Sequence, residues 1–211
     1  MDTSQVIINE ERPQLTKHLA TRFKEKIGQN VNLLGEVVLG NEEADHRYHH
    51  YLEALESPDI NYISVKISGI YAQTHALNYE ESFPELVSRM SALYQKAIDF
   101  PYTDEDGIKR SKFINLDMEE YKDAHFTLRL FKAVLNLPQF KNYSAGIVVQ
   151  AYLPDAYDFQ TELLEFAKAR IDGGGAPIKM RLVKGCNLEM ETVISSLKGW
   201  PNPDSSFQNR S

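Results

Sequence analysis

The chain has 211 residues, of which 42% are apolar and 25% are charged, as is typical of a globular protein with one well-buried domain. Its formal net charge of −7 argues against nucleic acid as a partner, because phosphate backbones are bound by basic surfaces. No run reaches the roughly 20 apolar residues of a membrane-spanning helix, so we expect membrane association to be peripheral at most.

Five short apolar runs recur along the chain, and each is followed by a stretch with helical periodicity. Before them, residues 1–28 form a polar segment with one amphipathic helix over residues 12–26. The predicted strands cover residues 31–34, 62–68, 113–118, 145–152 and 178–184. Helices are predicted over residues 42–56, 79–100, 156–171 and 188–197, with one more ending near Leu137. Residues 101–110 are turn-rich and charged, and they predict an exposed connection.

Strands that alternate with helices are expected to be parallel and joined by crossovers. The sequence therefore predicts an α/β fold, a partial (β/α)8 TIM-like barrel of about five βα units preceded by a helical segment. We expect three parts: an N-terminal segment over residues 1–28, the partial barrel over 29–200 and a disordered tail over 201–211.

Polar side chains recur on one side of the predicted strands. Residues two apart point to the same side of a strand, so Asn115 and Asp117 share a side, opposite Leu116. Lys66 and Arg181 have the same setting in their own strands. A parallel sheet covered on both faces is apolar on both sides. This pattern instead predicts a barrel interior used for chemistry, near the C-terminal strand ends where barrel active sites are built.

Lys66 and Arg181 are two cations that we expect to point inward. They suit a substrate carboxylate, or an electron-rich ring that needs positive charge where electrons arrive. The alternative is that each forms a structural salt bridge, for which Asp117 is the obvious partner. Asp117 itself has three open interpretations: a general base, a carboxylate that orients a cation, or the N-cap of the following helix.

The segment Lys184-Gly185-Cys186 predicts a strand-to-helix turn, in which the glycine lets a ligand approach the backbone. Cys186 is either a nucleophile beside Lys184 or a buried spectator. The second alternative is favoured, because no histidine lies near it in the sequence.

Three histidines have a spacing that can hold a metal ion on a helix. They fall in the middle of a predicted helix, away from the carboxylates of the strand ends, so a solvated or packing role is favoured and no metal site is predicted. They are His46, His49 and His50.

Five segments of the chain resemble the proline dehydrogenase family, in particular the proline dehydrogenase portion of bifunctional proline utilization A proteins. They are residues 32–36, 62–68, 115–121, 150–152 and 181–186. The resemblance extends over about residues 28–200 and rests on the combination of these motifs in this order.

The resemblance implies a distorted (β/α)8 barrel that holds FAD, oxidises L-proline to 1-pyrroline-5-carboxylate and passes the electrons to a quinone. It implies that Lys66 binds the proline carboxylate and that Asp117 is the catalytic carboxylate. Arg181 is implied to be catalytic as well, in contact with the flavin near its reactive nitrogen. The other cofactor-binding residues that it implies are Leu116, Gln150, Lys184, Gly185 and Cys186.

The sequence also departs from the family pattern. Gly185-Cys186-Asn187 stands where the family usually has Gly-Ala-Tyr. No counterpart is found for the family's substrate motif near the eighth strand, or for its cofactor residues on strands six and seven. We therefore expect a C-terminally truncated form that binds FAD poorly and oxidises proline slowly or not at all.

Two other functions stay open at this point. One is a barrel enzyme that uses Lys66 or Lys184 as a Schiff-base amine, and the other is a non-catalytic partial barrel that assembles with a partner chain. A homo-oligomer is compatible with the sequence. The cytoplasm is the expected location, because the N-terminus lacks the layout of a signal peptide and a single cysteine cannot form an internal disulfide.

Overall fold

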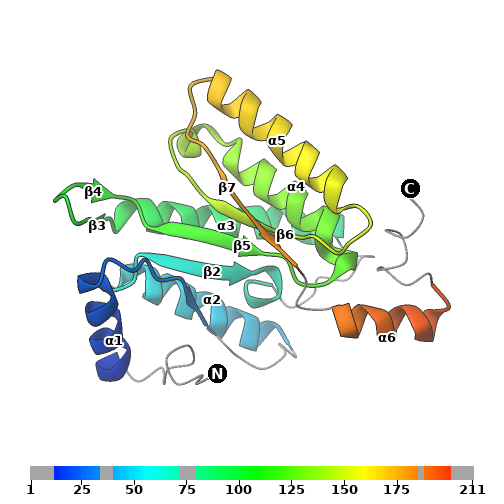
Figure 1. Cartoon of the computed structure of the whole chain (residues 1–211), viewed down its shortest axis with the longest axis horizontal. Helices are drawn as coiled ribbons and strands as arrows, with labels where there is room; N and C mark the ends of the chain where they lie inside the picture. Colours follow the sequence, from blue (N-terminus) through cyan, green and yellow to red (C-terminus); the bar gives the residue numbers. More distant parts are fainter. Residues whose placement is uncertain (1–11, 34–39, 72–78, 185–187, 201–211) are drawn as a thin grey trace.

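The computed structural model describes residues 12–33, 40–71, 79–184 and 188–200 (Figure 1). The strands are β1 (Val31–Asn32), β2 (Tyr62–Lys66), β3 (Tyr102–Thr103), β4 (Lys109–Arg110), β5 (Phe113–Asp117), β6 (Gly146–Gln150) and β7 (Lys179–Val183). The α-helices are α1 (Arg12–Lys24), α2 (Asn41–Glu56), α3 (Tyr79–Asp99), α4 (Ala124–Leu135), α5 (Ala156–Asp172) and α6 (Leu188–Lys198). Short 3-10 helices cover Ile67–Gly69, Tyr121–Asp123 and Pro138–Phe140.

Five of the strands form one parallel sheet in the order β1-β2-β5-β6-β7. Each strand of this sheet pairs with the sheet strand before it in the chain, in registers that place Lys66 opposite Asp117 and Val148 opposite Arg181. A helix lies in each connection, as parallel pairing requires. The predicted α/β fold, a partial TIM-like barrel of about five βα units, is thus confirmed.

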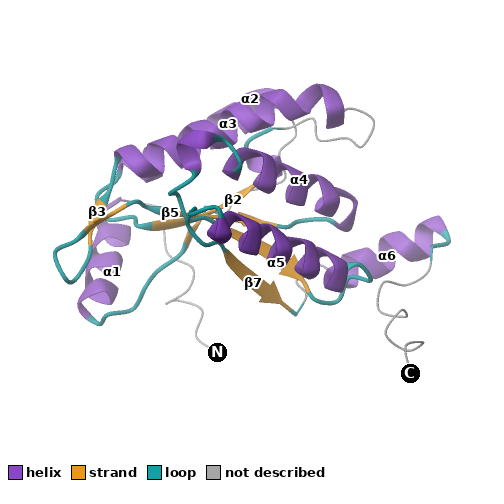
Figure 2. Ribbon diagram, turned by 90° about the horizontal axis from the view of Figure 1, so that it is seen from above, coloured by secondary structure: helices purple, strands orange, loops and turns teal. Residues whose placement is uncertain are grey.

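Helices cover the outer face of the sheet. Helices α2, α3 and α4 lie side by side along it (Figure 2), and α5 continues the layer beside α4, where the ring of Phe131 contacts that of Phe166. Helix α3 shows why the layer forms. Its residues Leu86, Met90 and Leu93 are completely buried, and a spacing of three and four residues puts them on one stripe of the helix.

The inner face of the sheet is strongly curled. The ammonium of Lys179 on β7 lies 5.1 Å from the ring centroid of Tyr62 on β2 and 5.6 Å from that of Phe113 on β5. Two strands, β5 and β6, separate β2 from β7 in the sheet. Such curling is what the wall of a barrel requires, and it buries the polar side chains of Ser64 and Asn115 on the inner face.

Strand β2 ends two residues earlier than the sequence predicted. The chain turns into the 3-10 helix Ile67–Gly69 directly after Lys66, so Ser68 does not continue the strand face of Lys66. Gly69 is required in this turn, because a Cβ there would lie 2.8 Å from the hydroxyl oxygen of Tyr51.

The predicted connection over residues 101–110 contains an antiparallel hairpin of β3 and β4. Its turn places Gly107 at φ 77°, a left-handed conformation that favours glycine. The predicted tail, residues 201–211, lies outside the described residues. None of the helices in the described segments is long and apolar enough to cross a bilayer.

Candidate active site

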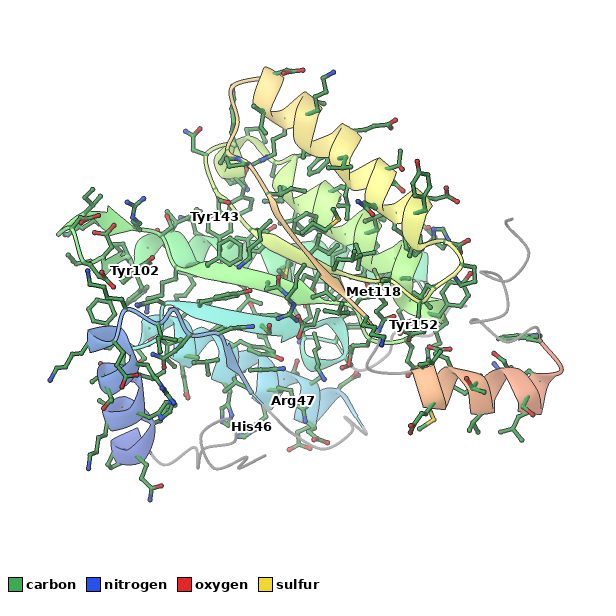
Figure 3. The ribbon with its side chains drawn as sticks, in the orientation of Figure 1. His46, Arg47, Tyr102, Met118, Tyr143 and Tyr152 are labelled. Atoms are coloured by element: carbon green, nitrogen blue, oxygen red, sulfur yellow. The ribbon has the colours of Figure 1, made fainter. Side chains whose placement is uncertain are left out.

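The C-terminal ends of the parallel strands lie at one edge of the sheet, where Met118 and Tyr152 follow β5 and β6 (Figure 3). We call this edge the rim and define it by the last residues of four strands, Lys66, Asp117, Gln150 and Val183. Side chains from segments far apart in the sequence meet here, because all four strands run in the same direction.

Asp117 is held through one of its carboxylate oxygens. Oδ1 accepts hydrogen bonds from Asn115 Nδ2 at 2.6 Å, from an Arg181 Nη at 2.8 Å and from Ser64 Oγ at 3.2 Å. None of the described residues donates a hydrogen bond to Oδ2. The side chain is 12% exposed, so the carboxylate has a fixed orientation with one oxygen open.

The strand position of Asp117 excludes one of its three interpretations. It is the last residue of β5, and the 3-10 helix and α4 that follow have Glu120 and Asp123 at their N-caps. The N-cap interpretation of Asp117 is therefore wrong.

Arg181 crosses from β7 to Asp117 on β5 and forms the salt bridge that the sequence offered as an alternative. The guanidinium keeps a second donor, because Nε is buried and has no hydrogen-bond partner. A buried donor without an acceptor costs about 1–3 kcal/mol, but because this atom is closed to solvent, a ligand that brings an acceptor has to meet the other nitrogen atoms of the guanidinium. The side chain as a whole is 38% exposed, which leaves the site open to such a ligand.

Lys66 stands opposite Asp117 in the ladder between β2 and β5, but it does not form a salt bridge with that carboxylate. The half-buried lysine side chain makes no hydrogen bond or ion pair with any residue that the structure describes. The rim thus combines a neutralised pair, Asp117 with Arg181, and one cation available to an anionic group.

A second set of hydrogen bonds ties the loops of the rim together. The carboxylate of Glu119 accepts bonds from the backbone nitrogen of Ser68 at 3.2 Å and from its Oγ at 2.9 Å. Gln150 Nε2 donates to the carbonyl oxygen of Glu119 at 2.9 Å, and the hydroxyl of Tyr152 donates to Gln150 Oε1 at 3.4 Å. Gln150 is the rim residue of β6. Its side chain is completely buried, and both ends of its amide form hydrogen bonds.

The structure does not bring all of the expected cofactor residues together. Leu116 is completely buried in the apolar core, on the face of β5 opposite to Asp117. Lys184 directly follows β7 and is exposed. Gly185 and Cys186 lie outside the described residues.

The three histidines of α2 do not form a metal-like cluster. The rings of His46 and His50 contact each other at 4.3 Å between centroids, and His49 Nδ1 lies 2.7 Å from the carbonyl oxygen of Asp45. In the described ranges, no group of three or more His, Cys, Asp or Glu residues could hold a metal ion.

Two tyrosines near the site have raised pKa values. Burial raises the pKa of Tyr62, while Arg181 lowers it and Asp117 raises it further. Burial also raises the pKa of Tyr51 to about 12. Both hydroxyls therefore stay protonated at neutral pH.

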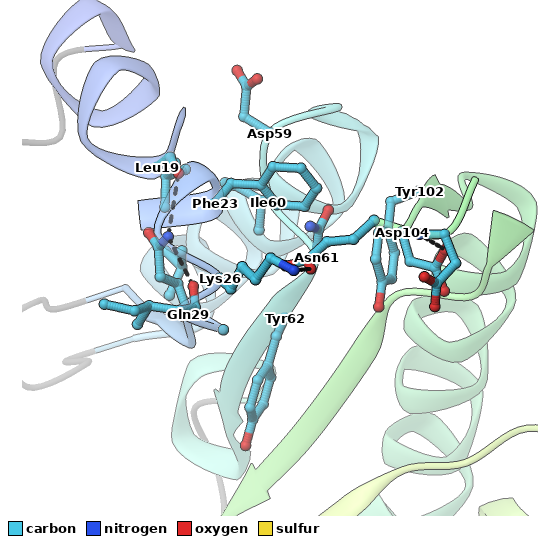
Figure 4. Close-up of a pocket in the computed structure, with 15 residues that line it drawn as sticks. Leu19, Phe23, Lys26, Gln29, Asp59, Ile60, Asn61, Tyr62, Tyr102 and Asp104 are labelled. Carbon is cyan, nitrogen blue, oxygen red and sulfur yellow. Dashed lines mark hydrogen bonds and ion pairs between the residues drawn. The ribbon is translucent and has the colours of Figure 1, made fainter. Parts of the chain in front are cut away.

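A hollow of about 340 Å³ lies at the opposite end of the sheet from the rim. It is bounded by α1, by the start of β2 at Tyr62 and by the β3–β4 hairpin at Tyr102 (Figure 4). The polar groups of the rim do not line it, so it belongs to the packing of α1 and not to the candidate active site.

Two residues of the site were missed by the sequence analysis. Neither Ser64 nor Asn30 was assigned a role, although Asn30 Nδ2 donates to Ser64 Oγ at 2.8 Å. The available signal was a serine between Ile63 and Val65 in a buried strand, since a buried hydroxyl needs partners.

Comparison with known proteins gives a consistent result. A family profile described as Proline dehydrogenase matches residues 15–206. The chain is similar to proline utilization A from Corynebacterium freiburgense, with 42% identity and a TM-score of 0.83, over 92% of this chain and 19% of that one. It is also similar to proline utilization A from Bdellovibrio bacteriovorus inactivated by N-propargylglycine, with 31% identity, a TM-score of 0.76 and coverages of 89% and 21%. The chain spans about a fifth of the length of these relatives, and no curated protein matches it.

Proposed function

The chain belongs to the proline dehydrogenase family, and on this premise we propose that it takes part in the FAD-dependent oxidation of L-proline to 1-pyrroline-5-carboxylate. The observation that carries the proposal is the meeting of Lys66, Asp117 and Arg181 at one rim of a curled parallel sheet. In barrels of this type, catalytic groups gather at that rim.

The rim offers one group for each polar part of the substrate. L-proline carries a carboxylate and a ring amine. Lys66 binds the carboxylate as a charge-assisted pair, because its ammonium is not engaged by the described residues. Asp117 Oδ2, which has no donor among them, accepts a hydrogen bond from the ring nitrogen and takes the proton that this nitrogen loses.

Arg181 suits a flavin ring. The ring has nitrogen and oxygen acceptors along its edge, and the guanidinium of Arg181, whose side chain is 38% exposed, keeps N–H donors beyond the one that binds Asp117. The positive guanidinium stabilises negative charge that develops on the ring. Lys184 offers an exposed cation for the diphosphate, and Gln150 lies behind the rim as support.

The chemistry that FAD supplies when bound is acceptance of the hydride that leaves the ring carbon next to the nitrogen. We propose a quinone as the later acceptor of the electrons. The residues of the chain bind the substrate at two points, hold its nitrogen against Asp117 and set a positive charge beside the electron acceptor.

We infer that the 211-residue chain alone binds FAD weakly and works slowly. Arg181 is 38% exposed, and Lys179 on the same face is exposed as well. Water that reaches the inner face screens the charges that hold cofactor and substrate.

The proposal is tested by titrating the 211-residue chain with FAD and following the quenching of flavin fluorescence. At saturating FAD, L-proline is added without oxygen and the loss of the oxidised flavin spectrum is timed. We expect weak, saturable FAD binding and slow bleaching by L-proline but not by D-proline. The variant Arg181→Met should bleach at least about tenfold more slowly, because it removes a charge-assisted contact.

Three results would contradict the proposal. They are the absence of saturable flavin binding, bleaching that is equal with both enantiomers, and bleaching that is unchanged in Arg181→Met. Trapping of a carbonyl compound on Lys66 or Lys184 by borohydride would favour a Schiff-base enzyme instead.

A further inference from the structure

Asp117 is held by two residues to which the proposed function gives no contact with substrate or cofactor. Ser64 lies in the middle of β2, is completely buried and donates to Asp117 Oδ1. Asn30 precedes β1, and its Nδ2 donates to Ser64 Oγ. A hydroxyl has a single hydrogen, so the bond that Ser64 accepts from Asn30 leaves its own hydrogen for Asp117.

The hydrogen bonds around Asp117 differ in how firmly they are anchored. Arg181 comes from the edge strand β7 and is 38% exposed, and Asn115 comes from the same strand as Asp117 itself. In the hydrogen bond from Ser64 to Asp117, donor and acceptor are both buried, and hydrogen bonds in a protein interior are stronger than in water. Rotation of the carboxylate would break this bond together with the other two.

All three donors bind Oδ1 of Asp117, and this determines which carboxylate oxygen is left for a ligand. With Oδ1 saturated, Oδ2 is the oxygen that remains for a ligand. The two oxygens of a carboxylate are equivalent, so what the donors fix is the plane of the group. A carboxylate whose plane could turn would pair less well with a donor in a fixed place, because misplacement by even 1 Å weakens such contacts.

We propose that Ser64 and Asn30 are positioning residues, which orient the Asp117 carboxylate so that Oδ2 alone meets the ring amine of the substrate. They thereby set the preference of the site for a cyclic amino acid over a carboxylic acid of the same shape that lacks the amine. The inference rests on the proposed function, in which Lys66 binds the carboxylate that both compounds share.

The test compares two ligands that differ in the amine alone. Dissociation constants of L-proline and cyclopentanecarboxylate are measured by calorimetry for the full 211-residue chain at saturating FAD that is kept reduced without oxygen, so that L-proline binds without being oxidised. The ratio of the two constants reports the contact between Asp117 and the amine, and in the unaltered chain we expect L-proline to bind about 10- to 100-fold more tightly. The variants Ser64→Ala and Asn30→Ala should reduce this ratio about 3- to 10-fold.

Three further variants separate positioning from general damage. Ser64→Thr keeps the hydroxyl and should restore the ratio. Lys66→Met should weaken both ligands alike and leave the ratio unchanged. Asn142→Ala, which replaces an exposed asparagine in the loop before β6, should change neither constant. Asn30 is also exposed, so its replacement leaves the core intact even if Ser64→Ala unfolds the chain.

The outcomes distinguish the inference from the proposed function. If the unaltered chain prefers L-proline but Ser64→Ala and Asn30→Ala keep the full ratio, the positioning role is refuted and the proposed function stands. The positioning role is also refuted if Ser64→Thr folds and behaves like Ser64→Ala. If the unaltered chain binds neither ligand, or binds both equally, the proposed function and the inference fail together.

Discussion

Two lysines on the same face of the sheet differ in what surrounds their charges. The ammonium of Lys179 lies over the rings of Tyr62 and Phe113, an arrangement that is itself favourable for a cation. Lys66 has no such contact and no ion pair within the described part of the chain. Lys66 is therefore the lysine whose charge is available to a ligand.

We predict that Lys66→Met weakens binding of L-proline about 10- to 100-fold, because a charge-assisted hydrogen bond contributes about 1.5–3 kcal/mol. Lys179→Met is the matched control, since it removes one positive charge from the same face away from the rim. It should change the affinity less than about threefold. Calorimetric titration at saturating reduced FAD measures both, and equal weakening in the two variants would show that net charge, and not the position of Lys66, determines binding.

The residue scale also shows what the sequence could and could not predict. Alternation along a strand placed Asn115 and Asp117 on one face, and the structure agrees. The same rule already placed Leu116 on the opposite face, so its expected contact with the cofactor conflicted with the pattern, and it lies in the core. The contact of Asn30 with Ser64 could not be predicted, because it depends on the register of β1 against β2, which places Asn32 opposite Ser64.

Strand β6 begins at Gly146, a position where the neighbouring side chains leave no room for a Cβ. A Cβ on Gly146 would lie 2.5 Å from Asn115 Oδ1 and 2.9 Å from a ring carbon of Phe113. The amide of Asn115 packs against the bare backbone there while its nitrogen donates to Asp117. The fit between β5 and β6 is therefore connected to the orientation of the Asp117 carboxylate.

We predict that Gly146→Ala lowers the free energy of unfolding by about 1–3 kcal/mol, as overpacking of a well-filled core does. It should also weaken L-proline binding, because Asn115 must shift. Gly28→Ala is the control: no atom lies within 4 Å of its Cβ position, so its effect should stay within about 0.5 kcal/mol. Urea unfolding of both variants checks this, and equal stabilities would contradict the packing argument.

Arg170 joins several elements at the end of the barrel wall opposite to the rim. Its guanidinium donates to five backbone carbonyl oxygens, those of Leu135, Phe140, Lys141, Tyr143 and Ala176. These carbonyls belong to the end of α4 and to the segments before β6 and β7. A single side chain thus binds five backbone acceptors of the connections, two of which, the carbonyls of Phe140 and Lys141, also accept a backbone N–H.

We predict that Arg170→Lys lowers the free energy of unfolding by about 2–4 kcal/mol, because an ammonium cannot reach all of these acceptors and leaves buried carbonyls unsatisfied. Arg129→Lys is the control, since Arg129 forms an exposed pair with Glu80 and such pairs contribute little. Thermal and urea unfolding measure the difference. A loss of less than 1 kcal/mol in Arg170→Lys would show that water replaces the guanidinium.

The elements differ in how well their sequence predicted them. Strands β5, β6 and β7 were found to within two residues at each end, because their apolar runs end abruptly at polar residues. The hairpin of β3 and β4 was missed, since its strands have two residues each and its second strand is exposed and charged. The early end of β2 depends on the contact of Gly69 with Tyr51, which only the fold creates.

At the scale of the whole molecule, a buried lysine makes stability depend on pH. Lys112 is 1% exposed, and its ammonium donates to the carbonyl oxygen of Ser57. Burial lowers its pKa from 10.5 to about 8, against an opposing effect of Asp59. Between these two pH values the unfolded chain keeps a proton that the folded chain has lost, so the free energy of unfolding rises with pH.

We predict that Lys112 contributes a rise on the order of 2 kcal/mol to the free energy of unfolding between pH 8 and pH 10, measured as the difference between the curves of the unaltered chain and of Lys112→Met. Above pH 10 the free energy of unfolding should fall, because burial raises the pKa of Tyr51 and Tyr121 to about 12 in the folded chain, and the unfolded chain loses those protons first. Urea unfolding at stepped pH measures the curve. Lys112→Met should lack the rise but keep the fall, and an identical curve in this variant would refute the assignment to Lys112.

The overall topology was the most predictable level. Alternating strands and helices determine a parallel sheet almost by themselves, and five such units were recognised from apolar runs and helix periodicity. The degree to which the sheet curls could not be predicted from the sequence, because it arises from contacts between distant strands, such as that of Lys179 with Tyr62. Curling also brings Arg181 to Asp117, so the sequence could offer the salt bridge of the site only as one alternative among several.

The sequential strand order has a consequence for how the site is assembled during synthesis. Each strand of the sheet meets a partner that the ribosome has already released, so Asp117 takes its place between Asn115 and Ser64 while β7 is still unmade. The carboxylate is then anchored by neutral donors before its cation arrives. We expect chains that end after α4 and are released from the ribosome to protect β5 from protease, which would show that the site of Asp117 forms before Arg181 binds to it.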